Sequence, residues 1–214
     1  MSKMLVPHDY AKSVFINCPF DKDYEPLFRA IFFAIRDLNL KPRSALHVSD
    51  GSQPRIAKIL DLIENCRFSI HDICRTELDP VHGLPRFNVP FELGLDLGCK
   101  RYRTSDEEEK LLLILDTERD RYRTFLSDIA GQDIVNHNGS VEAVTCIVRD
   151  WLRPYLNPVK TQSGRTIYRR YQKFLVDLPV CCDNLRWDVD NLSFADFSWA
   201  VYDWIKTIRY SLDA

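Results

Sequence analysis

Several signatures of common protein classes are missing from this sequence. Neither a GxGxxG fingerprint nor a P-loop occurs, which disfavours a mononucleotide held in a cradle of glycines. The seven cysteines form no CxxC pair and no spacing with histidine that is typical of zinc, so we expect no metal site. No apolar run approaches the roughly 18 residues of a membrane span, and residues 1–12 lack the apolar core of a signal peptide. We therefore expect a protein of the reducing cytoplasm that does not contact a membrane.

The overall composition is that of a globular protein without a strong charge of either sign. Hydrophobic residues make up 45% of the 214 residues and charged residues 28%, which supplies enough apolar material for a sizeable core. The formal net charge is only -2. The basic and aromatic segment 165–173 is read as a solvated helix face, so we expect no nucleic-acid partner.

Short apolar segments alternate with helix-type patterns along most of the chain. We expect strands at 13–18, 43–48, 67–73, 111–116 and 133–137, with helices at 24–38, 54–63, 89–99, 118–129 and after the capping residue Ser140. This alternation predicts an α/β fold of flavodoxin-like type, with an open parallel five-stranded sheet and helices on both faces. Ligands of such folds bind outside the carboxyl ends of the strands.

The chain divides into a sheet domain at 13–157 and a C-terminal helical extension at 158–214. Within the extension, helices are expected at 166–178 and 193–212, where apolar residues recur at helical spacing. Two helices alone bury too little surface to fold independently. We expect them to pack on the sheet domain or on a partner.

Glu92 is the strongest candidate for a reactive group. It falls in the first turn of the helix predicted at 89–99, where the helix dipole is expected to lower its pKa and keep it ionised. An ionised carboxylate can attack an anomeric carbon or stabilise an oxocarbenium ion. The alternative is that Glu92 only complements the dipole. Gly94 and Gly98 would let this helix approach another backbone closely.

Further polar side chains follow the ends of the predicted strands. Asn17 lies at the end of the first strand with Phe20 and Asp21 beyond it, and Asp72 lies at the end of the third, so all belong to the carboxyl edge of the sheet. Asp21 and Asp72 have an alternative role as helix cap or loop partner. His71 points away from Asp72 and is read as structural.

Ribose hydroxyls or phosphates could be held by residues of the polar loops. The candidates are Asp50 and Arg55 near the second helix, and Arg86 and Asn88 in the long loop before Glu92. Arg55 has the alternative of neutralising Asp50. The charged segment 101–110 is read as a solvated surface link.

The segments that carry these residues resemble a known superfamily. Segment 63–73 ends a strand in the acid Asp72, and segment 88–94 reads Asn-Val-Pro-Phe-Glu-Leu-Gly. Both are similar to the superfamily that joins TIR domains and nucleoside 2-deoxyribosyltransferases. Segment 14–21 is similar to the first strand and loop of TIR domains. The resemblance covers residues 13 to about 156. Residues 89–91 read Val-Pro-Phe where TIR domains often carry Trp-Cys, so the resemblance does not separate the branches.

The resemblance implies a function. In enzymes of this superfamily, the glutamate that matches Glu92 cleaves the N-glycosidic bond of NAD or a nucleoside, and Asp72 and Asn88 match ligand contacts. NAD would then be a substrate, with no further cofactor. Bacterial TIR-like proteins of this size often act in anti-phage defence, and many need self-association or a partner protein to complete their sites.

Three hypotheses remain open at this point. The first is an N-glycosidase that acts on NAD or a related nucleotide. The second is a nucleoside 2-deoxyribosyltransferase or nucleotide hydrolase that uses Glu92 as a covalent nucleophile. The third is a non-catalytic module that binds a nucleotide or assembles with other copies.

Overall fold

The five expected strands form one parallel sheet in the computed structural model, which describes residues 9–47, 51–76, 78, 83, 87–103, 109–159 and 161–212. The strands lie in the order β2-β1-β3-β4-β5 and all neighbours are parallel. Their bounds are β1 Ser13–Asn17, β2 Lys41–Arg43, β3 Phe68–Asp72, β4 Leu111–Asp116 and β5 Ile134–Asn136. This order confirms the predicted flavodoxin-like α/β fold.

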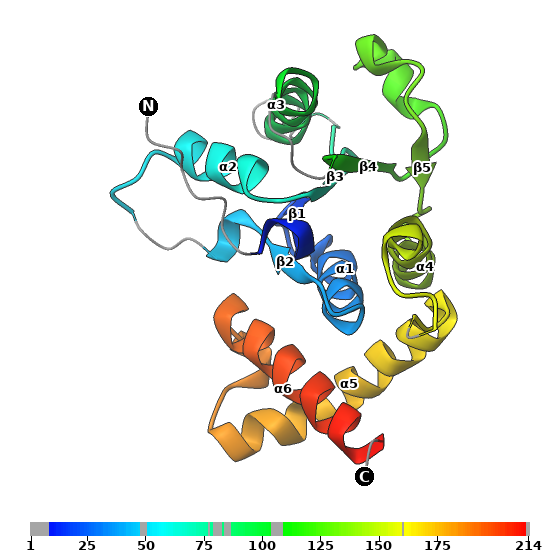
Figure 1. Cartoon of the computed structure of the whole chain (residues 1–214). Helices are drawn as coiled ribbons and strands as arrows, with labels where there is room; N and C mark the ends of the chain where they lie inside the picture. The colour runs from blue at the N-terminus through cyan, green and yellow to red at the C-terminus, as the bar shows by residue number, and fades with distance from the viewer. Residues whose placement is uncertain are drawn as a thin grey trace, which may run out of the picture.

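Helices cover both faces of the sheet (Figure 1). Helices α1 (Glu25–Asp37) and α4 (Val141–Leu152) lie on one face, and α2 (Arg55–Glu64) and α3 (Asn88–Tyr102) lie on the other. Successive strand residues point to opposite faces. In β1, Val14 and Ile16 therefore join the core formed with α1 and α4, whereas Phe15 packs with residues of α2.

The C-terminal helices form a further layer against α1 and α4 (Figure 1). They are α5 (Gly164–Leu185) and α6 (Phe194–Leu212), and their buried side chains belong to the same hydrophobic cluster as those of the sheet. The Phe33 ring of α1 lies 5.5 Å from that of Phe174 and 5.8 Å from that of Trp204. Arg170 of α5 also donates hydrogen bonds of 2.9 to 3.2 Å to both carboxylate oxygens of Asp37.

Two predicted elements were wrong in type or position. The second strand was expected at 43–48, but β2 pairs with β1 from Lys41 to Arg43 and is followed by a 3₁₀ turn, Ala45–His47. Pro42 obscured this strand, and its missing donor is tolerated because β2 lies at the edge of the sheet. The helix expected at 118–129 is replaced by two 3₁₀ turns, Arg121–Thr124 and Ser127–Ile129. Asp120 begins this region in the left-handed conformation, which an α-helix does not admit.

Serine side chains cap the N-termini of α4 and α5. The Ser140 hydroxyl accepts a hydrogen bond from the Ala143 amide and begins α4, as predicted. Ser163 begins α5 in the same way, through the Thr166 amide. Among the described helices, none is both long enough and apolar enough to cross a membrane.

Candidate functional site at the carboxyl edge of the sheet

The strand order places a binding crevice between the carboxyl ends of β1 and β3. The connections from these two strands run to opposite sides of the sheet, and ligands of such folds bind at this point. Asn17 ends β1 and Asp72 ends β3. Helix α3 crosses above this edge, and the Asn17 side-chain amide donates a 3.3 Å hydrogen bond to the Val89 carbonyl in the first turn of α3.

Glu92 lies in α3 with its side chain directed inward and 6% of its surface exposed. The helix begins at Asn88, so Glu92 is its fifth residue and belongs to the second turn, not the first as expected. Burial raises the pKa of Glu92, and the positive charge of Arg55 only partly opposes this rise. The predicted lowering by the helix dipole is therefore wrong, because the dipole acts mainly within the first turn and desolvation outweighs it.

None of the described residues holds the carboxylate of Glu92. Within the part of the chain that the structure describes, no hydrogen bond or ion pair reaches either of its oxygens. Partial loss of hydration without a compensating hydrogen bond disfavours the charged form, in agreement with the raised pKa of Glu92. Such groups are concentrated at functional sites.

The acids named from the sequence gather around Cys18, the residue that follows β1. Burial is the main cause of the raised pKa of the Cys18 thiol, and the negative charges of Asp72, Asp21 and Glu92 raise it further. Cys18 itself is only 2% exposed, so its thiol is packed and protonated. All three acids thus lie near enough to the end of β1 to act on Cys18 electrostatically.

Asp72 is engaged in a buried cluster. Its Oδ2 accepts a 2.5 Å hydrogen bond from the Tyr24 hydroxyl and lies 3.0 Å from His137 Nε2, and its Oδ1 accepts from the Cys74 amide. Burial alone would raise the pKa of Asp72, but the interactions with His137, Tyr24 and Cys74 bring it below its ordinary value. With the side chain fully buried, this geometry favours the structural role.

The Asp72 cluster contains residue types that bind metal ions, but its hydrogen bonds differ from those of a metal site. Asp72, Cys74 and His137 place one potential ligand atom each within 4.8 Å of one another. His137 Nδ1 accepts a 3.0 Å hydrogen bond from the Gly139 amide, so a neutral ring carries its hydrogen on Nε2, which faces Asp72. A metal-bound histidine would instead donate from its second nitrogen. The arrangement therefore fits an Asp–His contact better than a metal.

Phe20 and Asp21 lie on the loop between β1 and α1. They line a cavity of about 190 Å³ together with residues of α1 and the start of α6. Phe20 is 39% exposed and stands edge-on to Phe28, with ring centroids 5.6 Å apart. The Asp21 carboxylate accepts a 3.0 Å hydrogen bond from the Tyr24 amide and lies 3.3 Å from Arg75. Asp21 thus makes the contact expected of a cap at the start of α1.

The remaining candidates lie at the edge of this region or outside the described residues. Arg55 is the first residue of α2 and Asn88 the first of α3, and both are exposed. Each is free to reach a ligand from a helix N-terminus. Asp50 and Arg86 lie outside the described residues.

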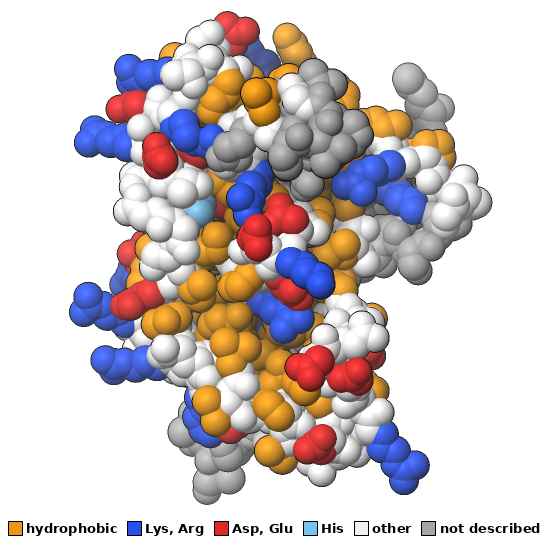
Figure 2. Space-filling model, turned by 180° about the vertical axis from the view of Figure 1, so that it is seen from behind, with side chains coloured by type: hydrophobic (Ala, Val, Ile, Leu, Met, Phe, Trp, Pro, Cys, Tyr) orange, Lys and Arg blue, Asp and Glu red, His pale blue; other side chains and the backbone are white. Residues whose placement is uncertain are grey.

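Two of the remaining cavities lie beside the Asp72 cluster and beside β1. One, of about 260 Å³, adjoins the Asp72 cluster and is lined by Arg75, Arg121 and His137 among others. Arg121 also holds Asp116 at 2.6 Å, so part of its charge is already neutralised. Figure 2 shows the molecule from the side opposite to Figure 1, with acidic and basic side chains interspersed over the middle of the surface and hydrophobic side chains gathered below them.

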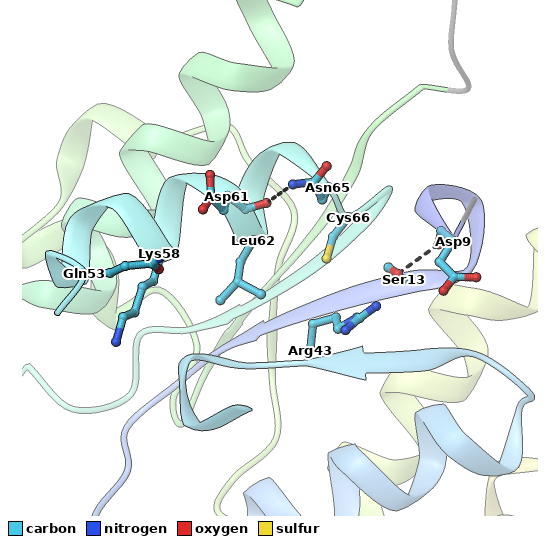
Figure 3. Close-up of a pocket in the computed structure, with 9 residues that line it drawn as sticks. All are labelled: Asp9, Ser13, Arg43, Gln53, Lys58, Asp61, Leu62, Asn65 and Cys66. Carbon is cyan, nitrogen blue, oxygen red and sulfur yellow. Dashed lines mark hydrogen bonds between the residues drawn. The ribbon is translucent and has the colours of Figure 1, made fainter. Parts of the chain in front are cut away.

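The other cavity, of about 250 Å³, lies between α2 and strands β1 and β2 (Figure 3). Ser13 and Cys66 mark its place near the amino ends of β1 and β3, away from Glu92. Arg43 and Lys58 line it together with Asp9 and Asp61, so both signs of charge are present. It holds none of the residues named from the sequence.

Sequence reasoning missed several residues of this region. Lys110 was placed in a solvated link, yet it is 2% exposed and donates to the Ile63 and Cys66 carbonyls at the end of α2. Asp96 was not considered, although it follows Glu92 by four residues and therefore shares its helix face. His71 was read as structural, and the structure places it between Asn17 and Asp96. In the sequence, only the four-residue spacing of Glu92 and Asp96 could have indicated that Asp96 belongs to this region.

Comparison of the chain with family models, curated proteins and solved structures finds no significant match. The function is therefore inferred from the geometry of the site and from the sequence resemblance.

Proposed function

We propose that this protein cleaves the N-glycosidic bond of NAD or a related nucleotide, with Glu92 as the catalytic residue. The observation that carries the proposal is the Glu92 carboxylate above the crevice between β1 and β3, which is largely covered and has no partner among the described residues. The resemblance of segments 63–73 and 88–94 to TIR domains and deoxyribosyltransferases supports the same residue.

The chemistry requires one well-placed negative charge. In NAD, the bond between the ribose anomeric carbon and the pyridinium nitrogen breaks, and its electron pair leaves with nicotinamide as a neutral molecule. No general acid is needed for that departure. The oxocarbenium ion that remains is stabilised by the Glu92 carboxylate, and the interaction is strengthened because the side chain is largely removed from water. Water then adds to the anomeric carbon and releases a proton to Glu92 or solvent.

The raised pKa of Glu92 gives this step a definite pH dependence. Only the ionised carboxylate stabilises the cation, and burial moves its titration above the ordinary value of 4.5. The rate of bond cleavage is expected to rise with pH through the pKa of Glu92 and then to level off. A profile without this acidic limb would exclude a carboxylate from the rate-limiting step.

Substrate binding is assigned to the groups around the crevice. Arg55 lies close enough to Glu92 to influence its pKa, and it would hold a phosphate beside the N-terminus of α2. Asn88 and the loop with Phe20 and Asp21 would contact the ribose and base. Self-association or a partner protein, and a role in bacterial anti-phage defence, belong to this proposal through the family resemblance alone.

The test is a substrate panel with matched variants. Wild-type protein, Glu92→Gln and Glu64→Gln are incubated with NAD, NADP and nucleosides over a range of protein concentrations that permits assembly. Glu64 is an exposed residue at the end of α2 and serves as the control. We expect release of the base by wild type and Glu64→Gln, and its loss in Glu92→Gln. Equal rates in all three proteins, or base release by none of them, would contradict the proposal.

The free carboxylate also supports a second candidate, covalent catalysis by Glu92. Because no described side chain restrains the carboxylate, it can approach the anomeric carbon and form a glycosyl ester, as in a deoxyribosyltransferase. Mass spectrometry of protein quenched during turnover of a deoxynucleoside would show the adduct on the peptide that contains Glu92. Tight nucleotide binding without any product would instead favour the non-catalytic module.

A further inference from the structure

A continuous chain of buried polar side chains runs beneath α3. The Asn17 amide donates a 3.0 Å hydrogen bond to His71 Nδ1, and His71 Nε2 donates a 2.9 Å bond to Asp96 Oδ2. Lys110 Nζ lies 3.1 Å from the other oxygen of Asp96 and donates to the Ser69 hydroxyl. None of the five linked residues exceeds 3% exposure, so the chain is closed to solvent.

This chain holds α3 at two points on either side of Glu92. At the start of the helix, the second hydrogen of the Asn17 amide is donated to the Val89 carbonyl. One turn after Glu92, Asp96 is held through both of its oxygens. His71 joins the two attachments, because its two nitrogens bind Asn17 and Asp96.

The two attachments determine how α3 is rotated about its axis. Residues four apart lie on the same helix face, so the inward direction of Asp96 is also that of Glu92. A helix held at one point only could roll and expose the Glu92 side chain. Held at Val89 and at Asp96, it keeps Glu92 only 6% exposed, with no hydrogen bond from its side chain to any described residue.

Stability alone is a poor explanation for this arrangement. A buried ion pair such as Asp96–Lys110 is costly to desolvate, and apolar residues of similar size often serve a fold as well or better. Elsewhere on this face of the sheet, α3 is held by apolar packing instead, because Leu93 packs against Ile73 and Ile114 without polar contacts.

We propose that His71 is a positioning residue, which fixes the rotation of α3 through Asn17 and Asp96 and thereby directs the Glu92 carboxylate into the crevice. The inference rests on the proposed function only where it treats Glu92 as the reacting group. The placement of Glu92 itself can be tested without any enzymatic activity.

The test compares two buried histidines on opposite faces of the sheet. His71→Phe removes the link between Asn17 and Asp96, whereas His137→Phe removes the equivalent neighbour of Asp72 away from α3. The first readout is the titration of the Glu92 side-chain carbon by NMR. Among the described groups, the charge of Arg55 lowers the pKa of Glu92, and the charge of Glu92 raises the pKa of Cys18. Both variants leave Arg55 and Cys18 unchanged.

We expect the Glu92 midpoint of His71→Phe to fall toward the ordinary value of 4.5, while wild type and His137→Phe keep the raised midpoint. In His71→Gln, which can still donate to Asp96, the midpoint should return most of the way to that of wild type. The second readout is catalysis, where misplacement by about 1 Å costs on the order of 100-fold in kcat with little change in KM.

The outcomes separate this inference from the proposed function. An unchanged Glu92 midpoint in His71→Phe, or an equal shift in His137→Phe, would overturn the positioning role. If His71→Phe does not fold, Asn17→Ala detaches the first attachment alone and decides the same question by the same titration. Absence of catalysis in the wild type would overturn the proposed function and leave the titration result standing.

Discussion

The packing of Phe174 gives the most quantitative prediction from this structure. Phe174 of α5 has no exposed surface, and its ring lies 5.5 Å from Phe33, 5.9 Å from Phe197 and 5.7 Å from Trp204. Replacing a buried phenylalanine by alanine costs about 3–5 kcal/mol, since both transfer energy and cavity contribute. For a chain of 214 residues, about 2–4 °C of melting temperature is lost per kcal/mol. Phe174→Ala should therefore melt roughly 6–20 °C below wild type.

The assay is thermal unfolding followed by two probes. Three of the four tryptophans, Trp187, Trp199 and Trp204, lie in the C-terminal extension, whereas circular dichroism reports the helices of the whole chain. Because both parts share one hydrophobic cluster, the two probes should shift together. Val176→Ala on the same helix is the control, since its side chain is 76% exposed and its effect should stay within about 0.5 kcal/mol. A shift seen by fluorescence alone would refute a shared core.

Three further predictions concern glycine and acidic residues. Gly94→Ala should stabilise the protein by about 0.5–1 kcal/mol, because an added methyl group meets no atom within 4 Å. Gly164→Ala should destabilise it, because the added methyl group would lie 2.7 Å from the Cys146 backbone. Urea unfolding distinguishes the two signs. Asp72 has a folded pKa below its ordinary value of 3.8, so the stability it contributes is present above that pH and is lost as the pH falls through the folded pKa. In Asp72→Asn, the free energy of unfolding should therefore fall less steeply as the pH is lowered. Glu92 has a raised folded pKa, so Glu92→Gln should raise the melting temperature at pH 7 but not below pH 4.5, and equal melting temperatures at pH 7 would contradict this.

The sheet could be predicted from the sequence because its strands carry strong local signals. The apolar run of β4 begins and ends where the sequence places it, from Leu111 to Asp116. The errors arose where local signals were weak or misleading. Pro42 hid the short edge strand β2, and the turns after Asp120 lack the capping and periodicity by which a helix is distinguished from irregular structure.

The candidate site was predicted in part. Glu92 was singled out from its segment, and the structure adds that it is buried and has no partner in the part of the chain that is described. Its pKa could not be inferred, because desolvation depends on how closely α3 packs against the sheet. The contacts of His71 with Asp96, 25 residues away, and of His137 with Asp72 could not be read from spacing either. Such contacts arise only when the folded sheet brings distant segments together.

The most direct test of the central claim is the rate of nicotinamide release from NAD by wild type and Glu92→Gln at equal concentrations of folded protein. Removal of the carboxylate should abolish measurable release while the melting temperature rises above that of wild type at pH 7. Release by Glu92→Gln at the wild-type rate would show that Glu92 is not the reacting group.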